Sequence, residues 1–221
     1  MKKIPVVPGI VPELPAEIKD IFFRHGVKQV VKKGFMSHDE FAEPVRMIMI
    51  NSGCFFHGLV DKNSNKDIAI SLLPRGRMVG FVNFFSRERM PSRSGALERS
   101  EIYVIPHKVM REIVNNDIKL LQIFSEYQER CNKSDMHMLW ALNLPVDDRI
   151  KILFTSALLS FGYDFDRETL NDWVALPINL TRPAIAQFAY SSILSVNRVL
   201  AVWREEGVLK KRKKCVSLKT Y

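Results

Sequence analysis

The side chains with the clearest chemical potential in this sequence are cations near its C-terminal end. Arg198 is the one cation between residues 192 and 203, and residues 210–214 are five consecutive cations. A guanidinium can donate two parallel hydrogen bonds to a guanine base, and a run of lysine and arginine attracts phosphate groups. From residue 181 to 221, nine positive and two negative residues give +7 of the chain's net charge of +9. This chemistry suits a nucleic-acid interface, although a basic run can also be a solvated face.

Two helices are expected to position these cations. From residue 192 onward, apolar residues recur at i, i+3, i+4 and i+7, which predicts one buried stripe along a helix. The stripe consists of Val196, Val199, Leu200 and Trp203. Leu194 and Arg198 fall on the opposite face. Thr181 and Ser192 are suited to cap a shorter first helix and this second one, because a hydroxyl accepts a hydrogen bond from the first turn. Two short helices joined by a tight turn predict a helix-turn-helix, although any two amphipathic helices share the pattern.

The segment that follows has the pattern of a hairpin. Apolar residues at 208–209 and 215–218 flank the cations of 210–214, which predicts a strand, a basic tip and a second strand. A basic hairpin beside a candidate recognition helix is typical of a winged helix whose tip contacts phosphates.

This C-terminal segment resembles the bacterial transcription regulators of the Crp/Fnr type. The matching residues are 178–182, 185–187, Ser192, Val196, 198–200, 207–209 and Val216. In that family the position of Arg198 reads base edges, and the positions of Ile193, Leu194 and Asn197 face the major groove. The resemblance implies that the DNA-binding residues are Thr181, Arg182, Ser192, Ile193, Leu194, Asn197, Arg198, Lys211, Arg212 and Lys213.

Four residues depart from the family pattern. Tyr190 stands where the turn usually has glycine, so we expect the turn to adopt another geometry. Lys213 replaces a glycine at the tip of the wing. Ile193 and Leu194 are apolar where family members often carry charged base readers, which implies a different DNA site read through thymine methyl groups or DNA shape.

The first half of the chain has a different pattern. Between residues 27 and 105, short apolar runs alternate with turn residues, which predicts a β-sandwich or β-barrel. The turns resemble those of the family's cyclic-nucleotide-binding-like barrel at residues 33–34, 50–53, 70–76 and 78–80.

We therefore expect an α+β protein in three parts. Residues 1–105 would form an antiparallel jelly-roll β-barrel, the sensor-like domain. Residues 106–145 would form a connecting and dimerisation helix with a hinge. Residues 146–221 would form the winged helix-turn-helix DNA-binding domain.

The positions that bind a ligand in this family's barrel also depart from the pattern. Members that bind cyclic nucleotides have a glutamate after the glycine that matches Gly80, whereas this chain has Phe81. A phenyl ring cannot accept a hydrogen bond from a ribose hydroxyl. Arg93 and Ser94 either form the arginine–serine pair that holds the phosphate or belong to a solvated loop. We predict no cyclic-nucleotide control.

No cofactor or metal is predicted either. The three cysteines are fewer than the four that the iron–sulfur cluster of oxygen-sensing members needs, and their spacing fits neither a zinc site nor a disulfide framework. The five histidines are scattered, and they read as surface or satisfied barrel histidines, although His38 and His57 could approach each other in a barrel.

The longest helical pattern runs from residue 106 to 142. Its apolar residues recur at alternating fours and threes, which suits a helix that packs on a partner. The predicted dimerisation seam comprises Leu120, Phe124, Tyr127, Cys131, Met138 and Leu142. In the family the matching helix pairs with its twin, which implies a homodimer. The alternative is a helix buried within its own subunit, with Ser134 marking either an exposed point of the seam or a polar register device.

These features favour a dimeric, sequence-specific transcription regulator of the Crp/Fnr type whose partners are double-stranded DNA, a second copy of the chain and RNA polymerase. The alternative is a regulator that acts through protein–protein contacts with a degenerate DNA-binding domain. We expect no enzyme, because no nucleophile, base and orienting group or phosphate-binding loop stands out. No apolar run reaches the length of a membrane span, and four prolines interrupt residues 1–15, so we expect a cytoplasmic protein.

Overall fold

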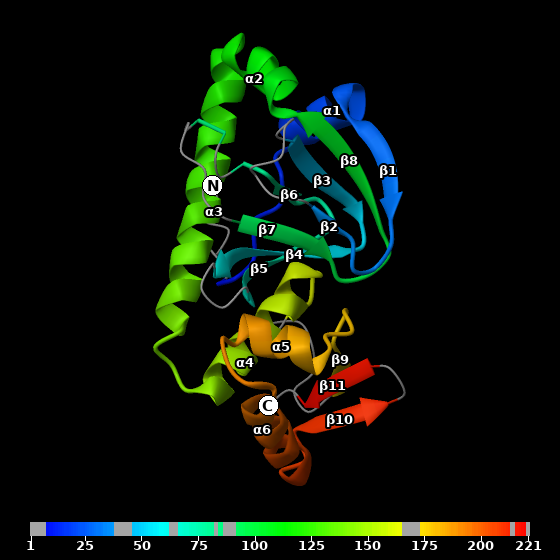
Figure 1. Ribbon diagram of the computed structural model, residues 1–221, viewed down its shortest axis with the longest axis vertical. Helices are drawn as coiled ribbons and strands as arrows, with labels where there is room; N and C mark the ends of the chain where they lie inside the picture. Colours follow the sequence, from blue (N-terminus) through cyan, green and yellow to red (C-terminus); the bar gives the residue numbers. More distant parts are fainter. Residues whose placement is uncertain are drawn as a thin grey trace. The chain divides into compact units, whose positions relative to one another are not determined.

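A computed structural model describes residues 8–37, 46–61, 66–81, 84–85, 92–164, 173–212 and 215–219. The chain divides into two compact units, residues 1–137 and 138–221, and the division falls inside the long helix α3 (Ile118–Ala141). Figure 1 shows the elements of both units coloured along the chain.

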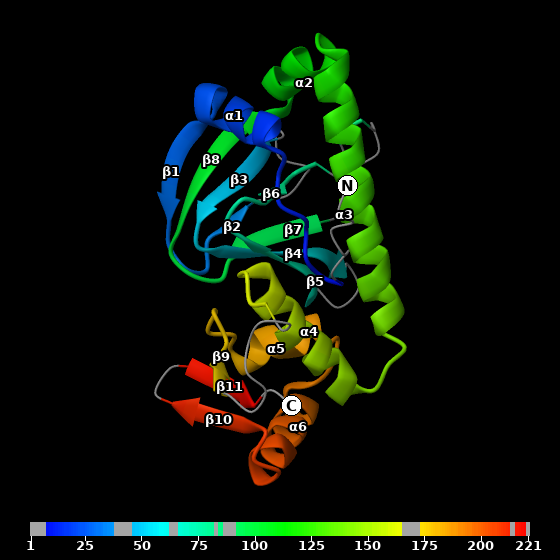
Figure 2. The same ribbon diagram turned by 180° about the vertical axis from the view of Figure 1, so that it is seen from behind.

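The first unit contains two four-stranded sheets in which every strand pair is antiparallel (Figures 1 and 2). One sheet has the order β1-β8-β3-β6, with strands β1 (Val27–Val31), β8 (Ser100–Pro106), β3 (Arg46–Ser52) and β6 (Met78–Val79). The other has the order β2-β7-β4-β5, with strands β2 (Met36–Ser37), β7 (Ser92–Ala96), β4 (Cys54–Asp61) and β5 (Lys66–Pro74). Buried side chains from both sheets form one core. The predicted antiparallel class is therefore confirmed.

Glycines allow two of the tight turns in these sheets. Gly53 joins β3 to β4 with φ of 86°, and Gly80 follows β6 with φ of 85°. A Cβ atom at Gly53 would collide with the Ser100 side chain, and one at Gly80 would collide with the backbone carbonyl of Arg46. Only glycine meets both requirements, a left-handed backbone and close contact with a neighbouring strand.

Three helices complete the first unit: α1 (Ala16–His25), α2 (His107–Asn115) and α3. All three contribute buried side chains to the core of the sheets. Asp117 caps α3, because its Oδ1 accepts hydrogen bonds from the backbone N–H groups of Lys119 at 2.9 Å and Leu120 at 3.1 Å. The helical pattern predicted from residue 106 to 142 is thus divided into two helices, α2 and α3.

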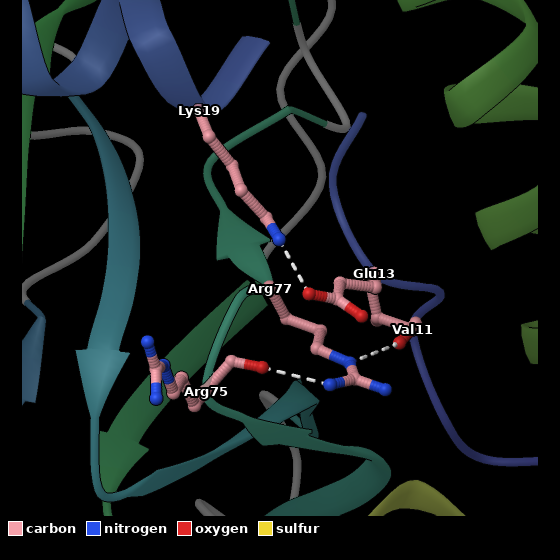
Figure 3. A network of polar contacts seen from close by, with 5 residues as sticks. All are labelled: Val11, Glu13, Lys19, Arg75 and Arg77. Carbon is pink, nitrogen blue, oxygen red and sulfur yellow. Dashed lines mark hydrogen bonds and ion pairs between the residues drawn. The ribbon is translucent and has the colours of Figure 1, made fainter. Parts of the chain in front are cut away.

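The segment before α1 is held on the sheets by a small polar network (Figure 3). The guanidinium of Arg77 donates from Nε to the carbonyl of Val11 at 3.2 Å and from Nη1 to the carbonyl of Arg75 at 2.7 Å. Beside it, Lys19 of α1 forms an ion pair with Glu13. These contacts fix where the chain enters α1.

The same segment also joins β5 to α3. The backbone N–H of Ile10 donates to Ser134 Oγ at 3.1 Å, and that hydroxyl donates to the carbonyl of Ile10 at 2.8 Å. On the other side, the backbone N–H of Leu72 donates to the carbonyl of Gly9 at 2.7 Å. Ser134 is fully buried. It is therefore a partner for the N-terminal backbone and not an exposed point of a seam.

The described residues of the second unit form the end of α3, three further helices and a three-stranded sheet. The helices after α3 are α4 (Val146–Ser160), α5 (Arg182–Phe188) and α6 (Ile193–Glu205). The sheet has the order β10-β11-β9, with strands β9 (Trp173–Ala175), β10 (Leu209–Arg212) and β11 (Cys215–Lys219). The ring of Trp203 packs edge-on against Phe154 of α4 at 6.0 Å, and its Nε1 donates to Asp147 Oδ1 at 2.6 Å. These contacts hold α6 against α4.

Among the described residues, no single helix is long and apolar enough to cross a membrane. Helices α5 and α6 reach that length and composition only as a pair, and the chain bends by 105° between them. An angle of this size is the geometry of a helix-turn-helix.

Candidate functional site

Both predicted helix caps are formed in the helix-turn-helix. Thr181 Oγ1 accepts a hydrogen bond from the backbone N–H of Ala184 at 3.3 Å, at the start of α5. Ser192 Oγ accepts from the backbone N–H of Ser195 at 3.0 Å, at the start of α6. The cap fixes where helix α6 begins, and the first residues of the helix are Ile193 and Leu194.

The turn between the helices has the left-handed geometry that glycine adopts most readily. Tyr190 has φ of 45°, the one positive value among the described residues that are not glycine. Our expectation of another turn geometry was wrong, because the backbone accepts the strain of a tyrosine in this conformation. The Arg149 guanidinium donates from Nη1 to the Tyr190 carbonyl at 3.2 Å, which ties α4 to the turn.

Replacing Tyr190 with glycine should raise the free energy of unfolding by about 0.5–1 kcal/mol. The left-handed conformation costs a residue with a Cβ roughly 1–2 kcal/mol, and the added freedom of glycine in the unfolded chain offsets about 0.5–1 kcal/mol of the gain. Denaturant unfolding of the Tyr190→Gly variant measures this change. The control is Ser191→Gly, which has no positive φ to relieve and should lower the stability.

The outer face of α6 combines apolar and polar side chains. Ile193 and Leu194 are 47% and 59% exposed, and Arg198 is also exposed. Asn197 is half-buried, and its Oδ1 has no hydrogen-bond partner among the described residues. On the inner side, Val196, Leu200 and Trp203 are buried and Val199 is half-buried. The predicted faces of this helix are therefore observed.

Two further predicted DNA-binding residues, Thr181 and Arg182, lie at the start of α5. Both are exposed. They precede α6 by one helix and one turn, in the same unit.

The wing differs from its prediction in the place of its cations. Strand β10 continues to Arg212, and its backbone pairs Lys211 with Val216 and Arg212 with Cys215. The sequence pattern predicts residues 210–214 to be the tip, whereas residues 210–212 belong to strand β10. Antiparallel pairing with β11 overrides the low strand preference of lysine. Lys213 and Lys214 lie outside the described residues.

Strand β9 was missed by the sequence analysis. It pairs with β11 and places the ring of Trp173 below Lys210, whose Nζ lies 4.0 Å from the ring centroid. This cation–π contact holds the ammonium of the exposed Lys210 side chain over the Trp173 ring. An aromatic and a β-branched residue in sequence, Trp173 and Val174, were the available signal.

The predicted dimerisation seam lies mostly inside the first unit. Phe124, Tyr127 and Cys131 are fully buried and belong to the core that the sheets form. Leu120 packs partly against the same core. These side chains contact their own subunit, which was the alternative reading, and their assignment to a partner-facing seam is corrected. An apolar stripe with this spacing can pack against a sheet as well as against a second helix.

The remaining seam residues lie at the end of α3. Met138 is buried, and Leu142 is half-buried just after the last residue of the helix. The opposite face of α3 exposes Met136, Leu139 and Trp140, spaced at i, i+3 and i+4. Apolar residues at this spacing form one patch on a helix. This patch was not identified from the sequence.

Phe81 lies in the core between the sheets and α3. It is buried, and its ring packs edge-on against Tyr127 at 5.9 Å. Beside it, His107 Nε2 lies 2.5 Å from the Gly80 carbonyl, at hydrogen-bond distance. The phenyl ring is therefore part of the packed core and contacts α3.

A row of buried polar side chains crosses the second sheet. Ser94, His57 and Ser71 are direct cross-strand neighbours on β7, β4 and β5, so they point to the same side. His57 Nδ1 lies 3.0 Å from Ser94 Oγ, and Ser71 Oγ donates to Asp135 Oδ1 of α3 at 2.5 Å. Burial lowers the pKa of His57 to about 4 and raises the pKa of Asp135. The Ser94 hydroxyl is thus a partner of His57, and the prediction of a satisfied barrel histidine is confirmed for His57.

The cysteines of the first unit are buried free thiols. Burial raises the pKa of Cys54 and of Cys131 well above the usual range of a thiol. A thiol in this state is a poor nucleophile. No group of three or more potential metal ligands occurs among the described residues. His38 lies outside them.

No protein-family model and no curated protein matches this sequence. Solved structures do match it. The c-di-GMP responsive global regulator CLP of Xanthomonas campestris is 15% identical, with 94% of this chain and 100% of that chain covered and a TM-score of 0.71. FixK2 from Bradyrhizobium japonicum is 11% identical, with 88% and 93% covered and a TM-score of 0.70. A putative transcriptional regulator of the Crp/Fnr family from Eubacterium rectale is 15% identical, with 93% and 90% covered and a TM-score of 0.69. The chain therefore has the fold of the Crp/Fnr-type transcription regulators.

Proposed function

We propose that this protein is a homodimeric, sequence-specific DNA-binding transcription regulator. The observation that carries the proposal is the exposed guanidinium of Arg198 on the outer face of a capped helix that follows a 105° bend. The recognition helix of a helix-turn-helix lies in the major groove, where arginine donates two hydrogen bonds to guanine O6 and N7. The charge of +7 on residues 181–221 supports phosphate binding around it.

The Arg198→Ala variant should bind its preferred DNA site about 1–3 kcal/mol more weakly and lose the preference for guanine at one position of each half-site. The preferred site is first selected from a random DNA library with the wild-type protein. Affinities for this site and for single-base variants of it are then measured at one fixed salt concentration. Equal affinity and an unchanged preference would refute the role of Arg198.

The wing provides the matched control for this test. Neutralising Lys211 and Arg212 together also removes positive charge, but phosphate contacts carry no sequence information. This variant should bind all sequences more weakly by the same factor, and its salt dependence should fall by roughly one unit of slope per lost phosphate contact. A changed base preference would show that the wing reads bases.

We propose that the dimer forms through the exposed face of α3. Phe124, Tyr127 and Cys131 are engaged in their own core, which leaves the patch of Met136, Leu139 and Trp140 for a partner. The same helix in a second copy offers the same patch, as a twofold interface requires. Such a dimer places two recognition helices on half-sites about one helical turn of DNA apart.

We propose further that cyclic nucleotides do not control this regulator. Two observations support this: Phe81 follows Gly80 in the sequence, where the resemblance implies a ribose-binding glutamate, and its ring is buried against Tyr127 of α3. Titration calorimetry with cyclic AMP and cyclic GMP at protein concentrations of tens of micromolar should give no binding heat. Micromolar binding of either nucleotide would contradict this part of the proposal and leave the DNA-binding part intact.

A second candidate function is regulation through protein–protein contact with a degenerate DNA-binding domain. The exposed apolar side chains of Tyr190, Ile193 and Leu194 favour it, since apolar patches often mark protein contacts. A mobility shift of DNA that weakens with salt supports the first candidate. Absence of any shift together with an intact fold supports the second.

A further inference from the structure

We propose that Ile193 and Leu194 read the C5-methyl groups of pyrimidine bases in the major groove, beside the guanine contacted by Arg198. This inference rests on the proposed DNA-binding function and specifies the chemistry of its site. It concerns the first turn of α6, the part of a recognition helix that contacts base edges.

The first observation that supports this inference is the exposure of the side chains at the start of α6. Tyr190, Ile193 and Leu194 are 55%, 47% and 59% exposed, although each is a large apolar residue. Their spacing of three and four residues places them around the start of α6. The Ser192 hydroxyl caps the helix there, since it accepts from the Ser195 N–H. The turn and the start of α6 therefore present three large, mainly apolar side chains to solvent, with Ser192 exposed between them in the sequence.

The chemical groups in the major groove determine what these apolar side chains can contact. Isoleucine and leucine side chains have no hydrogen-bond donor or acceptor, so they cannot pair with the polar edges of guanine, adenine or cytosine. Covering such an edge would leave it without water and without a partner, which is unfavourable. The one apolar group in the major groove is the methyl group at C5 of thymine, and 5-methylcytosine carries the same group.

The helix geometry sets the distance to the guanine. Asn197 follows Ile193 by four residues, and Arg198 follows Leu194 by four, so each pair lies on one face of α6. Four residues span about 6 Å along a helix, and base pairs are stacked about 3.4 Å apart. The methyl group should therefore lie within roughly two base pairs of the guanine that Arg198 reads.

The strain at Tyr190 agrees with this placement. Its φ of 45° is unfavourable for tyrosine, and its side chain is 55% exposed in the turn that precedes Ile193 and Leu194. Backbone strain of this kind gathers at functional sites.

The test removes single methyl groups from DNA. Each thymine of the selected site is replaced in turn by deoxyuridine, which lacks only the C5-methyl group, and the dissociation constant is measured at fixed salt. The wild-type protein should bind roughly three- to tenfold more weakly at one or two positions near the Arg198-dependent guanine. Ile193→Ser and Leu194→Ser should each lose this sensitivity at one of the positions.

Two controls make the result specific. Val202→Ser changes another apolar residue of α6, 48% exposed but near the C-terminal end of the helix, and should keep the full sensitivity. Cytosine and 5-methylcytosine at the sensitive position distinguish the two sources of the methyl group. A gain from cytosine methylation shows that the methyl group itself is read, and a response to thymine alone assigns the site to thymine.

Equal binding of thymine and deoxyuridine at every position would overturn this inference, as would a sensitivity that both serine variants retain. Either result leaves the proposed function intact if Arg198→Ala still loses its guanine preference. Failure of the folded wild-type protein to bind any DNA would overturn both.

Discussion

The Phe124→Ala variant is expected to unfold with a free energy about 3–5 kcal/mol below that of the wild-type protein. Phe124 is fully buried, and its ring lies 4.6 Å from that of Phe84 and 5.7 Å from that of Phe85. Truncation removes these contacts and leaves a cavity in the core. Denaturant unfolding, followed by the circular dichroism of the sheets and helices, measures the loss.

Trp140→Ser is the matched control on the same helix. Trp140 is 66% exposed, so its replacement should change the free energy of unfolding of the subunit by less than about 0.5 kcal/mol. It should instead weaken the proposed dimer, which sedimentation at several protein concentrations would show. The opposite result would be a Phe124→Ala subunit as stable as the wild type and a Trp140→Ser dimer as strong as the wild type. It would show that Phe124, Tyr127 and Cys131 contact the partner subunit.

The second large effect that we expect is a loss of stability at low pH. Burial lowers the pKa of His57 to about 4, whereas an unfolded histidine titrates near 6.5. Between these values the unfolded chain binds more protons than the folded one, so stability falls as the pH is lowered from 6.5 to 4. The contribution of His57 to this loss is about 3 kcal/mol. Unfolding free energies measured across this range should show the slope.

His57→Gln isolates this contribution, because glutamine keeps a polar group beside Ser94 but does not titrate. The variant should lose most of the slope between pH 6.5 and 4. Asp135 has the opposite effect on the pH dependence of stability. Burial raises its pKa, so just above pH 3.8 the folded state binds more protons at Asp135 than the unfolded chain, and stability rises as the pH is lowered. A variant whose slope equals that of the wild type would show that His57 is protonated as easily in the folded protein as in the unfolded chain.

The second unit could be predicted well from the sequence because local signals determine its elements. Thr181 and Ser192 each cap the helix that they precede, and the stripe of α6 is buried as its spacing predicts. Gly162, with φ of 90°, follows the end of α4, where glycine is the residue that adopts a left-handed backbone most readily. Each of these features depends on residues within one or two helical turns. The wing was less predictable, because the pairing partner of Lys210–Arg212 decides that they form a strand.

The first unit shows what local signals leave undetermined. Apolar spacing established that α3 has a buried face, but it did not distinguish its own sheets from a second subunit. The row from Ser94 to Asp135 depends on strand register, which shifts between His57 and Gly58 of β4. Such a shift changes which residues are neighbours and leaves no pattern in the sequence. Tyr190 is a different case, because the turn geometry was dictated by the fold against the preference of the residue.

The bond between Ile10 and Ser134 sets an order of events during synthesis. The two residues are 124 positions apart, and the N-terminal segment also pairs with Leu72 of β5. Chains are made from the N-terminus at about 5–20 residues per second, so residues 8–11 emerge several seconds before Ser134. During that interval the nascent sheets have no long helix to cover them. The first unit can complete its core only after α3 has left the ribosome, and a chain that stops before it would expose the surface of Phe81 and Phe84 to chaperones and proteases.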